Sequence, residues 1–434
     1  MANITQTDPV TTTASNSSGS RGAMVIVTSL FFIWGFLTCL NDILVPHLKA
    51  IFDLNYAQVM MVQFSFFSAY FIFAVPSGKI IEWIGYKRTM VLGLLTMGLG
   101  AFLFIPAASV PSFPLFLTAL MVLAAGITAL QVSANPYVAV LGSPETASSR
   151  LNLTQAFNSL GTTIAPFFGS MLILSAAPKT IAEMRQMLPA NLQAYRLHEA
   201  ATVKMPYLGL AVALLVLAFL IAKAHLPVLS VEHHDPGAAT DSVWKHPHLV
   251  LGAVAIFAYV GAEVSIGSFL VNYLSLPQIG DMTTKVAARY VALYWGGAMV
   301  GRFIGSALLR KFRTGTLLAI AAGVASALVL TSMGTSGHIA AWAILLVGLF
   351  NSIMFPSIFT LSIDGLGPLT GKGSGLLVAA IVGGAILPVI QGVIADHIGV
   401  QHAFILPVVS YIYIAYFALK GSRLRGPAVA TEAI

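Results

Sequence analysis

The stretch Met24–Leu48, MVIVTSLFFIWGFLTCLNDILVPHL, decides the fold class of this 434-residue chain. It is apolar and long enough to cross a bilayer as a helix, which takes about 20 residues. Asp42 lies inside this run. A carboxylate at that depth costs roughly 2.5–3.5 kcal/mol on insertion scales, so it should face a protein interior or a water-filled cavity, as in proton relays, ion sites and substrate sites. A structural acid bonded to a neighbouring helix is the alternative.

The composition extends this reading to the whole chain. Hydrophobic residues make up 57% of it and charged residues 9%, whereas soluble domains carry about 25% charged residues. Nothing alternates between polar and apolar residues over segments of about 10 residues, as β-barrel strands do. We therefore expect an all-α membrane protein with twelve spans, at 24–49, 57–82, 87–108, 112–141, 148–176, 204–226, 247–276, 285–309, 315–334, 338–364, 373–397 and 401–420.

The polar segments divide these spans into two halves, 24–226 and 247–420. Residues 1–23 are rich in Ser and Thr and lack the basic-then-apolar order of a signal peptide, so we expect a disordered cytoplasmic tail. Residues 227–246 are expected to be a cytoplasmic linker, and 421–434 a second cytoplasmic tail. With both termini inside, most of the 22 Lys and Arg residues fall on the inner side of a bacterial cytoplasmic (inner) membrane. The net charge of +7 therefore reports topology and does not indicate nucleic-acid binding.

The sequence lacks the motifs of an enzyme or a metal site. His233 and His234 lie in the polar linker without a second pair of ligands. Neither HExxH nor GxSxG occurs, and Cys39 is the single cysteine, which excludes an intramolecular disulfide. We expect no catalytic activity and no cofactor.

The two halves repeat each other at an offset of about 221 residues. Such a duplication of a six-helix unit is typical of secondary transporters, whose substrate site lies near the midplane between the halves. The corresponding pairs are Asp42 with Glu263, Arg88 with Arg310, Arg150 with Lys372, Gly161 with Gly383 and Pro166 with Pro388.

The loop after the second span reads GKIIEWIGYKR, from Gly78 to Arg88. It resembles the loop signature of the major facilitator superfamily, G-x-x-x-D-R-x-G-R-R, with Glu in place of Asp and Trp in place of the first Arg. The glycines permit a tight inner turn, and the acid and cations can pair with helix ends to hold an inward gate shut. A weaker counterpart occurs in the second half. The expected gating residues are Gly78, Glu82, Gly85, Lys87, Arg88, Arg302 and Arg310.

Buried amides indicate the substrate class. Gln131 and Asn135 in the fourth span share one helix face, as do Gln155 and Asn158 in the fifth. Amides both donate and accept hydrogen bonds, which suits a neutral polyol better than an anion or a lipophile. Contacts between helices are the alternative role. Asn351 of the tenth span, and Trp34 and Trp295 as platforms for the C–H face of a sugar, complete this group.

The seventh span offers Glu263 and Asn272. They lie nine residues apart, which places them about 180° apart around an ideal helix. Both can serve one site only if the helix unwinds, for which Gly261 and Gly267 are candidates. If it stays continuous, Glu263 is the expected site residue.

Four segments, FFIWGFLTCLND, ANPY, RLNLTQAFNSLG and YVGAEVSIGSFLVNYL, resemble the fucose/glucose–galactose carriers of the major facilitator superfamily, the fucose:proton symporter family. The resemblance implies the major facilitator fold, two six-helix halves with pseudo-twofold symmetry, and sugar uptake coupled to an inward gradient of a cation, usually protons. It implies proton coupling at Asp42 and sugar binding at Gln155 and Asn158.

One position departs from the fucose carriers, which hold a Glu where this chain has Gln131. Gln131 can bond a sugar but cannot take up a proton, so Glu263 is the candidate for the second carboxylate. This pattern is more similar to the glucose/galactose branch, and it leaves sodium coupling open.

These observations predict a sugar:cation symporter that works by alternating access on a hexose such as glucose or galactose. A carrier of N-acetylglucosamine or fucose, a sodium-coupled symporter, a drug or lipid exporter and a non-transporting sugar sensor remain alternatives. The expected partners are the sugar, the coupling cation and membrane lipid, with the protein as a monomer and no nucleic acid.

Overall fold

The computed structural model describes residues 17–51, 56–110, 112–172, 179, 183–184, 186–227 and 242–423. Within its helices, the side chains of 17–20, 40–61, 63, 168–172, 199–203 and 284 are not part of the description. Asp42 is therefore placed by its backbone alone. His233, His234 and the outermost parts of both predicted tails lie outside the described residues.

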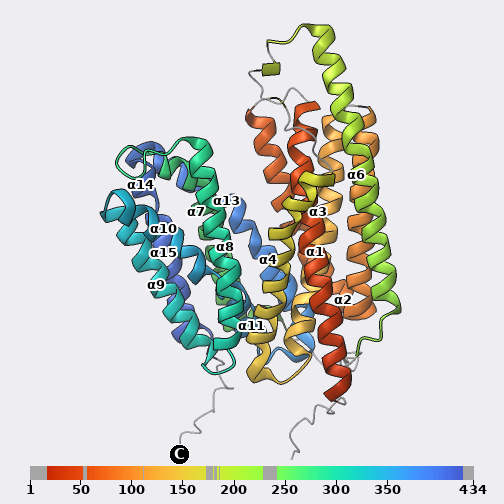
Figure 1. Cartoon of the computed structure of the whole chain (residues 1–434). Coiled ribbons are helices and arrows are strands. Elements are labelled where there is room, and N and C mark those ends of the chain that lie inside the picture. The colour runs from red at the N-terminus through yellow and green to blue at the C-terminus, as the bar shows by residue number, and fades with distance from the viewer. Residues whose placement is uncertain are drawn as a thin grey trace, which may run out of the picture.

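The first half consists of long helices joined by short connections. Its elements are α1 (Ser17–Ile51), α2 (Tyr56–Ser109), α3 (Phe113–Val140), η1 (Pro144–Thr146), α4 (Ala147–Leu172) and α6 (Pro189–Lys223). Ser17–Ala23 belong to α1, so the prediction of a disordered tail up to residue 23 is wrong for that part. The polar residues 189–203 form a helical extension of the sixth span, which rises beyond the other helices in Figure 1.

A single glycine divides α2 into two spans. Gly85 has φ 80° and ψ 168°, a backbone conformation that only glycine adopts without strain. The chain turns there, and the two arms of α2 become the second and third spans. The glycine spacing in the loop motif therefore predicted this turn correctly.

The second half is built from shorter pieces. Its elements are η2 (Val243–Lys245), α7 (Pro247–Leu274), α8 (Thr284–Leu308), α9 (Thr314–Gly334), α10 (Gly337–Asn351), α11 (Met354–Ile363), η3 (Gly367–Leu369), α12 (Thr370–Ala379), η4 (Ala380–Val382), α13 (Gly383–Ile398), α14 (Val400–Ala403), α15 (Ile405–Tyr416) and η5 (Phe417–Gly421).

Two spans of this half are discontinuous, but the seventh is not. The tenth breaks between α10 and α11, just before Pro356, whose ring removes the N–H that would continue the helix. The eleventh breaks at η4. In α7, the side chain of Leu387 packs against Gly261 and the ring of Trp295 packs against Gly267. These glycines therefore allow close packing. The unwinding suggested for α7 is therefore wrong.

Twelve spans account for the hydrophobic stretches. Among the described residues, nine helical stretches are long and apolar enough to cross a membrane, and one of them, Phe64–Ser109, contains two spans. The two remaining spans are α4 and α8, whose polar residues lower their hydropathy. The described part of the chain contains no strand. The predicted all-α fold is confirmed.

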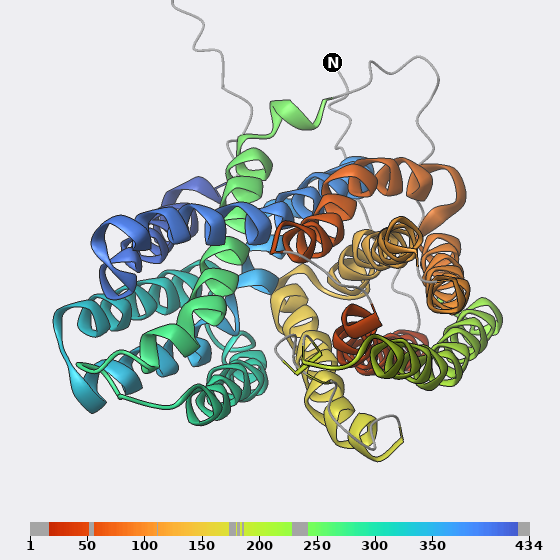
Figure 2. The ribbon, with the colours of Figure 1, turned by 90° about the horizontal axis from the view of Figure 1, so that it is seen from above.

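The two halves form separate bundles that meet at one end and diverge toward the other (Figure 1). Viewed along the bundles, α12 and α13 lie beside α2, and α8 lies beside α4 (Figure 2). We call the end where the halves touch the closed end and the opposite one the open end. In the repeat, α2 corresponds to α8 and α4 corresponds to α12. A twofold relation between the halves therefore converts the α2–α12 contact into the α4–α8 contact.

Helix packing supports the internal repeat. Gly161 in α4 lies against the carbonyl oxygen of Phe32 in α1, so closely that a Cβ would collide with it. Gly383 in α13 lies in the same way against the carbonyl oxygen of Phe257 in α7. The first span thus packs on the fifth as the seventh packs on the eleventh, with a glycine at equivalent positions in both contacts.

Candidate functional site

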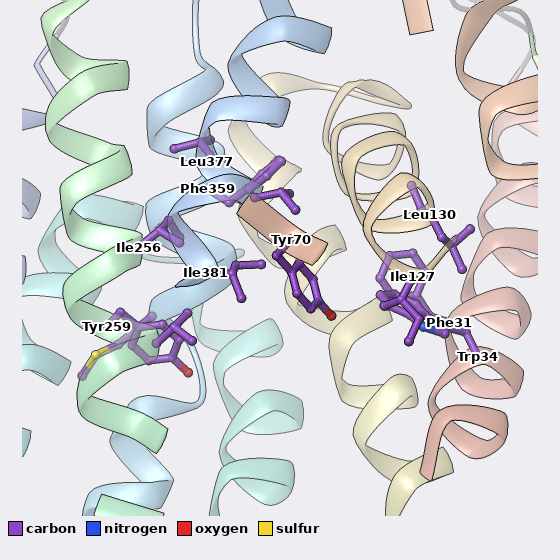
Figure 3. Packing of buried hydrophobic residues seen from close by; sticks show 14 of the residues in the cluster. Phe31, Trp34, Tyr70, Ile127, Leu130, Ile256, Tyr259, Phe359, Leu377 and Ile381 are labelled. Atoms are coloured by element: carbon purple, nitrogen blue, oxygen red, sulfur yellow. The ribbon is translucent and has the colours of Figure 1, made fainter. Parts of the chain in front are cut away.

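A cavity of about 270 Å³ lies between the two halves, near the middle of the bundle. Ligand pockets usually measure about 300–1,000 Å³, so this one suits a small molecule. In Figure 3, Tyr70 lies beside Ile381, with Tyr259 on the α7 side and Trp34 and Ile127 on the side of α1 and α3. The full lining is Trp34, Thr38, Phe66, Tyr70, Ile127, Gln131, Gln155, Asn158, Tyr259, Val260, Glu263, Arg302, Phe355, Pro356 and Ile381.

Three of the predicted amides line the first-half wall of this cavity. Gln131 donates from Nε2 to the hydroxyl of Tyr70 over 3.1 Å. Asn158 donates to the carbonyl oxygen of Phe31 over 2.9 Å, which ties α4 to α1. An amide has acceptors as well as donors, so this wall can offer both to a polyol.

Asn135 acts from behind this wall. It is fully buried and does not line the cavity, but its Oδ1 accepts a hydrogen bond of 3.1 Å from Nε2 of Gln155. That bond uses one of the two N–H donors of Gln155, so its other N–H and its amide oxygen are left for a ligand. Asn135 therefore orients a cavity residue without touching the cavity.

The second-half wall carries a carboxylate with aromatic support. Tyr259, one helical turn before Glu263, donates to Oε1 of Glu263 over 2.8 Å. The Tyr259 hydroxyl also lies 3.1 Å from the carbonyl oxygen of Asn351. Asn351 is fully buried behind the wall and donates from Nδ2 to the hydroxyl of Tyr294 over 2.8 Å. Tyr259 thus supports the carboxylate inside the membrane, where an unsupported acid would be costly.

Arg302 of α8 lines the cavity and connects the two halves. Its guanidinium donates to the hydroxyl of Ser159 in α4, and it lines the same cavity as Glu263. Its carbonyl oxygen accepts a bond of 2.7 Å from Nδ2 of Asn152. We predicted a gate salt bridge for Arg302 near the inner end, but the structure places it in the cavity lining.

Two predicted sugar contacts do not reach the cavity. Asn272 is exposed on α7, on the face opposite to Glu263, as expected for a continuous helix. Trp295 is 44% exposed and packs edge-on against Tyr294 and over Gly267. Neither residue belongs to the cavity lining, whereas Trp34 does.

The predicted gating motif lies at the closed end, between α2 and α12. A Cβ at Gly78 would stand 2.7 Å from the carbonyl oxygen of Gly371, so the two backbones are in contact there. Glu82 pairs with Lys372 of the other half over 3.0 Å. Lys87 is half-buried, and Arg88 and Arg310 are exposed.

A polar contact closes the other side of the same end, between α4 and α8. The hydroxyl of Ser149 donates to the carbonyl oxygen of Ser306 over 2.7 Å, and the Ser306 hydroxyl donates to the carbonyl oxygen of Ser149 over 3.1 Å. Ser148 lies 2.6 Å from Thr360 and accepts a bond of 3.0 Å from Thr314. These contacts, together with those between α2 and α12, seal the closed end.

Arg150 has a local role. Its guanidinium donates to the carbonyl oxygens of Val138 and Ala139 at the end of α3, over 3.3 Å and 2.6 Å. A cation at a helix C-terminus stabilises the helix dipole. Arg150 therefore fixes the turn between the fourth and fifth spans.

Sequence reasoning missed several lining residues. Tyr259 carried a usable signal, because it lies four residues before Glu263 and so shares its helix face. Tyr70 and Phe66 carried none, since they lie within an apolar run in which any face could have turned to lipid. The side chain of Asp42 lies outside the described residues, and its role stays a prediction.

Comparison with known proteins agrees with this geometry. Residues 24–381 match the model of the Major Facilitator Superfamily. The chain is 53% identical to a glucose/galactose transporter of Brucella abortus over 97% of this chain and 99% of that one. It is 35% identical to the L-fucose-proton symporter of Escherichia coli, over 91% of each chain.

A solved structure extends the agreement to three dimensions. The crystal structure of the Escherichia coli fucose symporter in its outward conformation superposes with a TM-score of 0.86 at 35% identity, over 91% of this chain and 97% of that one. The described fold, the central cavity and these relatives lead to one conclusion: this chain belongs to the Major Facilitator Superfamily, in the group of the glucose/galactose transporters and L-fucose-proton symporters.

Proposed function

We propose that this protein takes up a hexose such as glucose or galactose by symport with a cation, most simply the proton. The cavity is the observation that carries this proposal, because it combines amides, tyrosine hydroxyls, Trp34 and a carboxylate between the two halves. Amides and hydroxyls match the donors and acceptors of a sugar, and an aromatic ring covers its apolar C–H face. The names of the 53%- and 35%-identical relatives support the same substrate class and coupling.

The proposed mechanism is alternating access. Sugar enters from the open end, which faces the periplasm in this assignment, and contacts Gln131, Gln155 and Asn158. Glu263 and Asp42 are the proposed sites of proton coupling. Protonation removes a buried charge and so lowers the cost of sealing the site from water. The halves then rock, the closed end opens to the cytoplasm, and loss of the proton resets the carrier.

We propose further that the protein lies in the bacterial inner membrane as a monomer, with both termini in the cytoplasm. Resemblance to the fucose symporter structure in its outward conformation supports reading the closed end as the cytoplasmic one. Arg88, Arg150, Arg310 and Lys372 lie near that end, in agreement with the positive-inside rule.

Counterflow in proteoliposomes tests the proposal. Vesicles loaded with unlabelled glucose or galactose should take up labelled sugar of the same kind without any ion gradient. N-acetylglucosamine and fucose in the same panel report on the other sugars, and a sodium gradient reports on the coupling ion. Binding without counterflow would favour a sensor and overturn transport.

Asp42→Asn separates coupling from transport. The variant should keep counterflow but lose proton-driven accumulation, because exchange needs no net proton movement. Retention of full accumulation by Asp42→Asn would contradict the coupling role.

A further inference from the structure

We call the contact between the two halves at the closed end the seam. Pro136 of α3 leaves one carbonyl group in this seam without its helical partner. In an α-helix the carbonyl oxygen of Val132 accepts from the N–H of residue 136, but proline has no N–H. A buried carbonyl group that lacks a partner is costly, so the molecule must satisfy it in another way.

The other half of the protein supplies that partner. The hydroxyl of Ser374 in α12 donates to the carbonyl oxygen of Val132 over 2.8 Å, and the Ser374 side chain is fully buried. Val132 directly follows Gln131, which lines the cavity. The bond therefore joins the second half to the backbone next to a cavity amide of the first half.

An equivalent bond runs in the opposite direction. Asn152 holds the position in the first half that Ser374 holds in the second, by the same offset that relates Arg150 to Lys372. Its Nδ2 donates to the carbonyl oxygen of Arg302, another cavity residue, over 2.7 Å. Two repeat-related side chains thus reach across the seam to the main chain beside the cavity.

We propose that Ser374 is a positioning residue that completes the helix interrupted by Pro136 only while the closed end is shut, and so ties that closure to the placement of Gln131. Asn152 makes the equivalent contact with the main chain of Arg302, where α8 is uninterrupted, and so adds a second bond across the seam. When the halves part at this end, Val132 loses its partner from the second half. We also expect Gln131 to bind sugar less well in that state, and this expectation rests on the proposed function. The link between Ser374, Pro136 and closure is independent of the proposed function.

A double-mutant cycle tests this proposal with Ser374→Ala, Pro136→Ala and the double variant. Pro136→Ala restores a backbone N–H that can bond to Val132 within α3, so it makes the Ser374 hydroxyl redundant. Spin labels at two exposed positions on opposite halves, such as Trp83 and Phe312, report the closed fraction by pulsed electron resonance without any sugar. A change in tryptophan fluorescence on adding sugar reports sugar affinity, because Trp34 lines the cavity.

Ser374→Ala alone should lower the ratio of closed to open molecules about two- to tenfold, the usual effect of one lost hydrogen bond. In the Pro136→Ala background the same change should have an effect of less than about twofold, by the same reasoning. Sugar affinity should fall in parallel, and by more than the closed fraction alone accounts for. An equal effect of Ser374→Ala in both backgrounds, or none on the closed fraction, would overturn the proposal.

Ser133→Ala is the matched control. Ser133 adjoins Val132 and is also fully buried, but its hydroxyl bonds within α3 to the carbonyl oxygen of Ala129 over 2.7 Å. Its removal should leave the closed fraction unchanged and show no coupling to Pro136→Ala.

If Ser374→Ala fails to fold, Asn152→Ala tests the equivalent bond, and a closed fraction equal to that of the unmodified protein would contradict the proposal. If the unmodified protein binds no hexose, the proposed function fails while the spin-label arm still decides on the seam.

Discussion

Gly78 offers the sharpest perturbation of the closed end. A Cβ added there would lie 2.7 Å from the carbonyl oxygen of Gly371 in the opposite half. Carbon atoms approach carbonyl oxygens to about 3.3 Å at closest, so Gly78→Ala forces α2 and α12 apart by about 0.6 Å. Overpacking of this kind costs about 1–3 kcal/mol. The cost arises only while the end is shut, so it appears as a shift in the conformational equilibrium.

The expected shift is about 5- to 150-fold toward molecules that are open at this end. Spin labels on the two halves should show a longer distance in Gly78→Ala, and reagents added from the open end should modify a cysteine placed in the cavity more slowly. Sugar affinity measured from that side should fall in proportion to the fraction of molecules that remain closed at this end. A Cβ at Gly371 would lie 3.3 Å from the carbonyl oxygen of Gly78, at the limit of normal contact, so Gly371→Ala should shift the equilibrium far less than Gly78→Ala.

Gly323→Ala provides the control. Gly323 lies in α9, and no atom lies within 4 Å of the position that a Cβ would occupy there. Alanine at this position therefore changes only helix propensity, by up to about 1 kcal/mol. The control should leave the label distance unchanged. If Gly78→Ala also left it unchanged, the backbone contact between α2 and α12 would not be what holds the closed end shut.

Three further predictions concern the site and the seam. Glu82→Gln should shift the closed-end label distances by less than Gly78→Ala does, because Glu82 and Lys372 are 26% and 38% exposed and exposed ion pairs contribute only about 0.2–1 kcal/mol; a larger shift would show that the ion pair dominates. Asn135→Ala should weaken sugar binding about two- to tenfold although Asn135 does not line the cavity, because Gln155 loses its partner; calorimetric titration with an unchanged affinity would contradict this. Glu263→Gln should keep counterflow and lose proton-driven accumulation, and uphill uptake equal to that of the unmodified protein would remove Glu263 from the coupling step.

The sequence was sufficient for the spans, because a bilayer imposes length and hydropathy on every crossing helix. Even the turn at Gly85 was predictable, since the motif demands a glycine there. The breaks in the tenth and eleventh spans were harder to place. Pro356 accounts for the first of them, but we predicted no break there. Gly261 and Gly267 indicated unwinding in α7, whereas the structure shows that they serve packing.

The site was predictable to the extent that polar residues in apolar spans cannot face lipid. Gln131, Gln155, Asn158 and Glu263 follow this rule and line the cavity. Asn272 breaks it, because it lies near the end of α7, where exposure is cheap. The rule also fails to separate cavity residues from their supports, so it gave no means to place Asn135 and Asn351 behind the wall.

The interaction between the halves had no sequence signal of its own. Serine and threonine cost little in a membrane helix because they bond to their own backbone, so Ser149 and Ser374 did not stand out. Only the assembled structure shows that their hydroxyls cross the seam instead.

The most direct test of the account is proton movement driven by sugar. Proteoliposomes that contain the purified protein, in weakly buffered medium without a pH gradient, should make the external medium more alkaline when glucose or galactose is added outside. Asp42→Asn should abolish this signal while counterflow persists. Sugar uptake by the unmodified protein without any change in external pH would contradict proton symport.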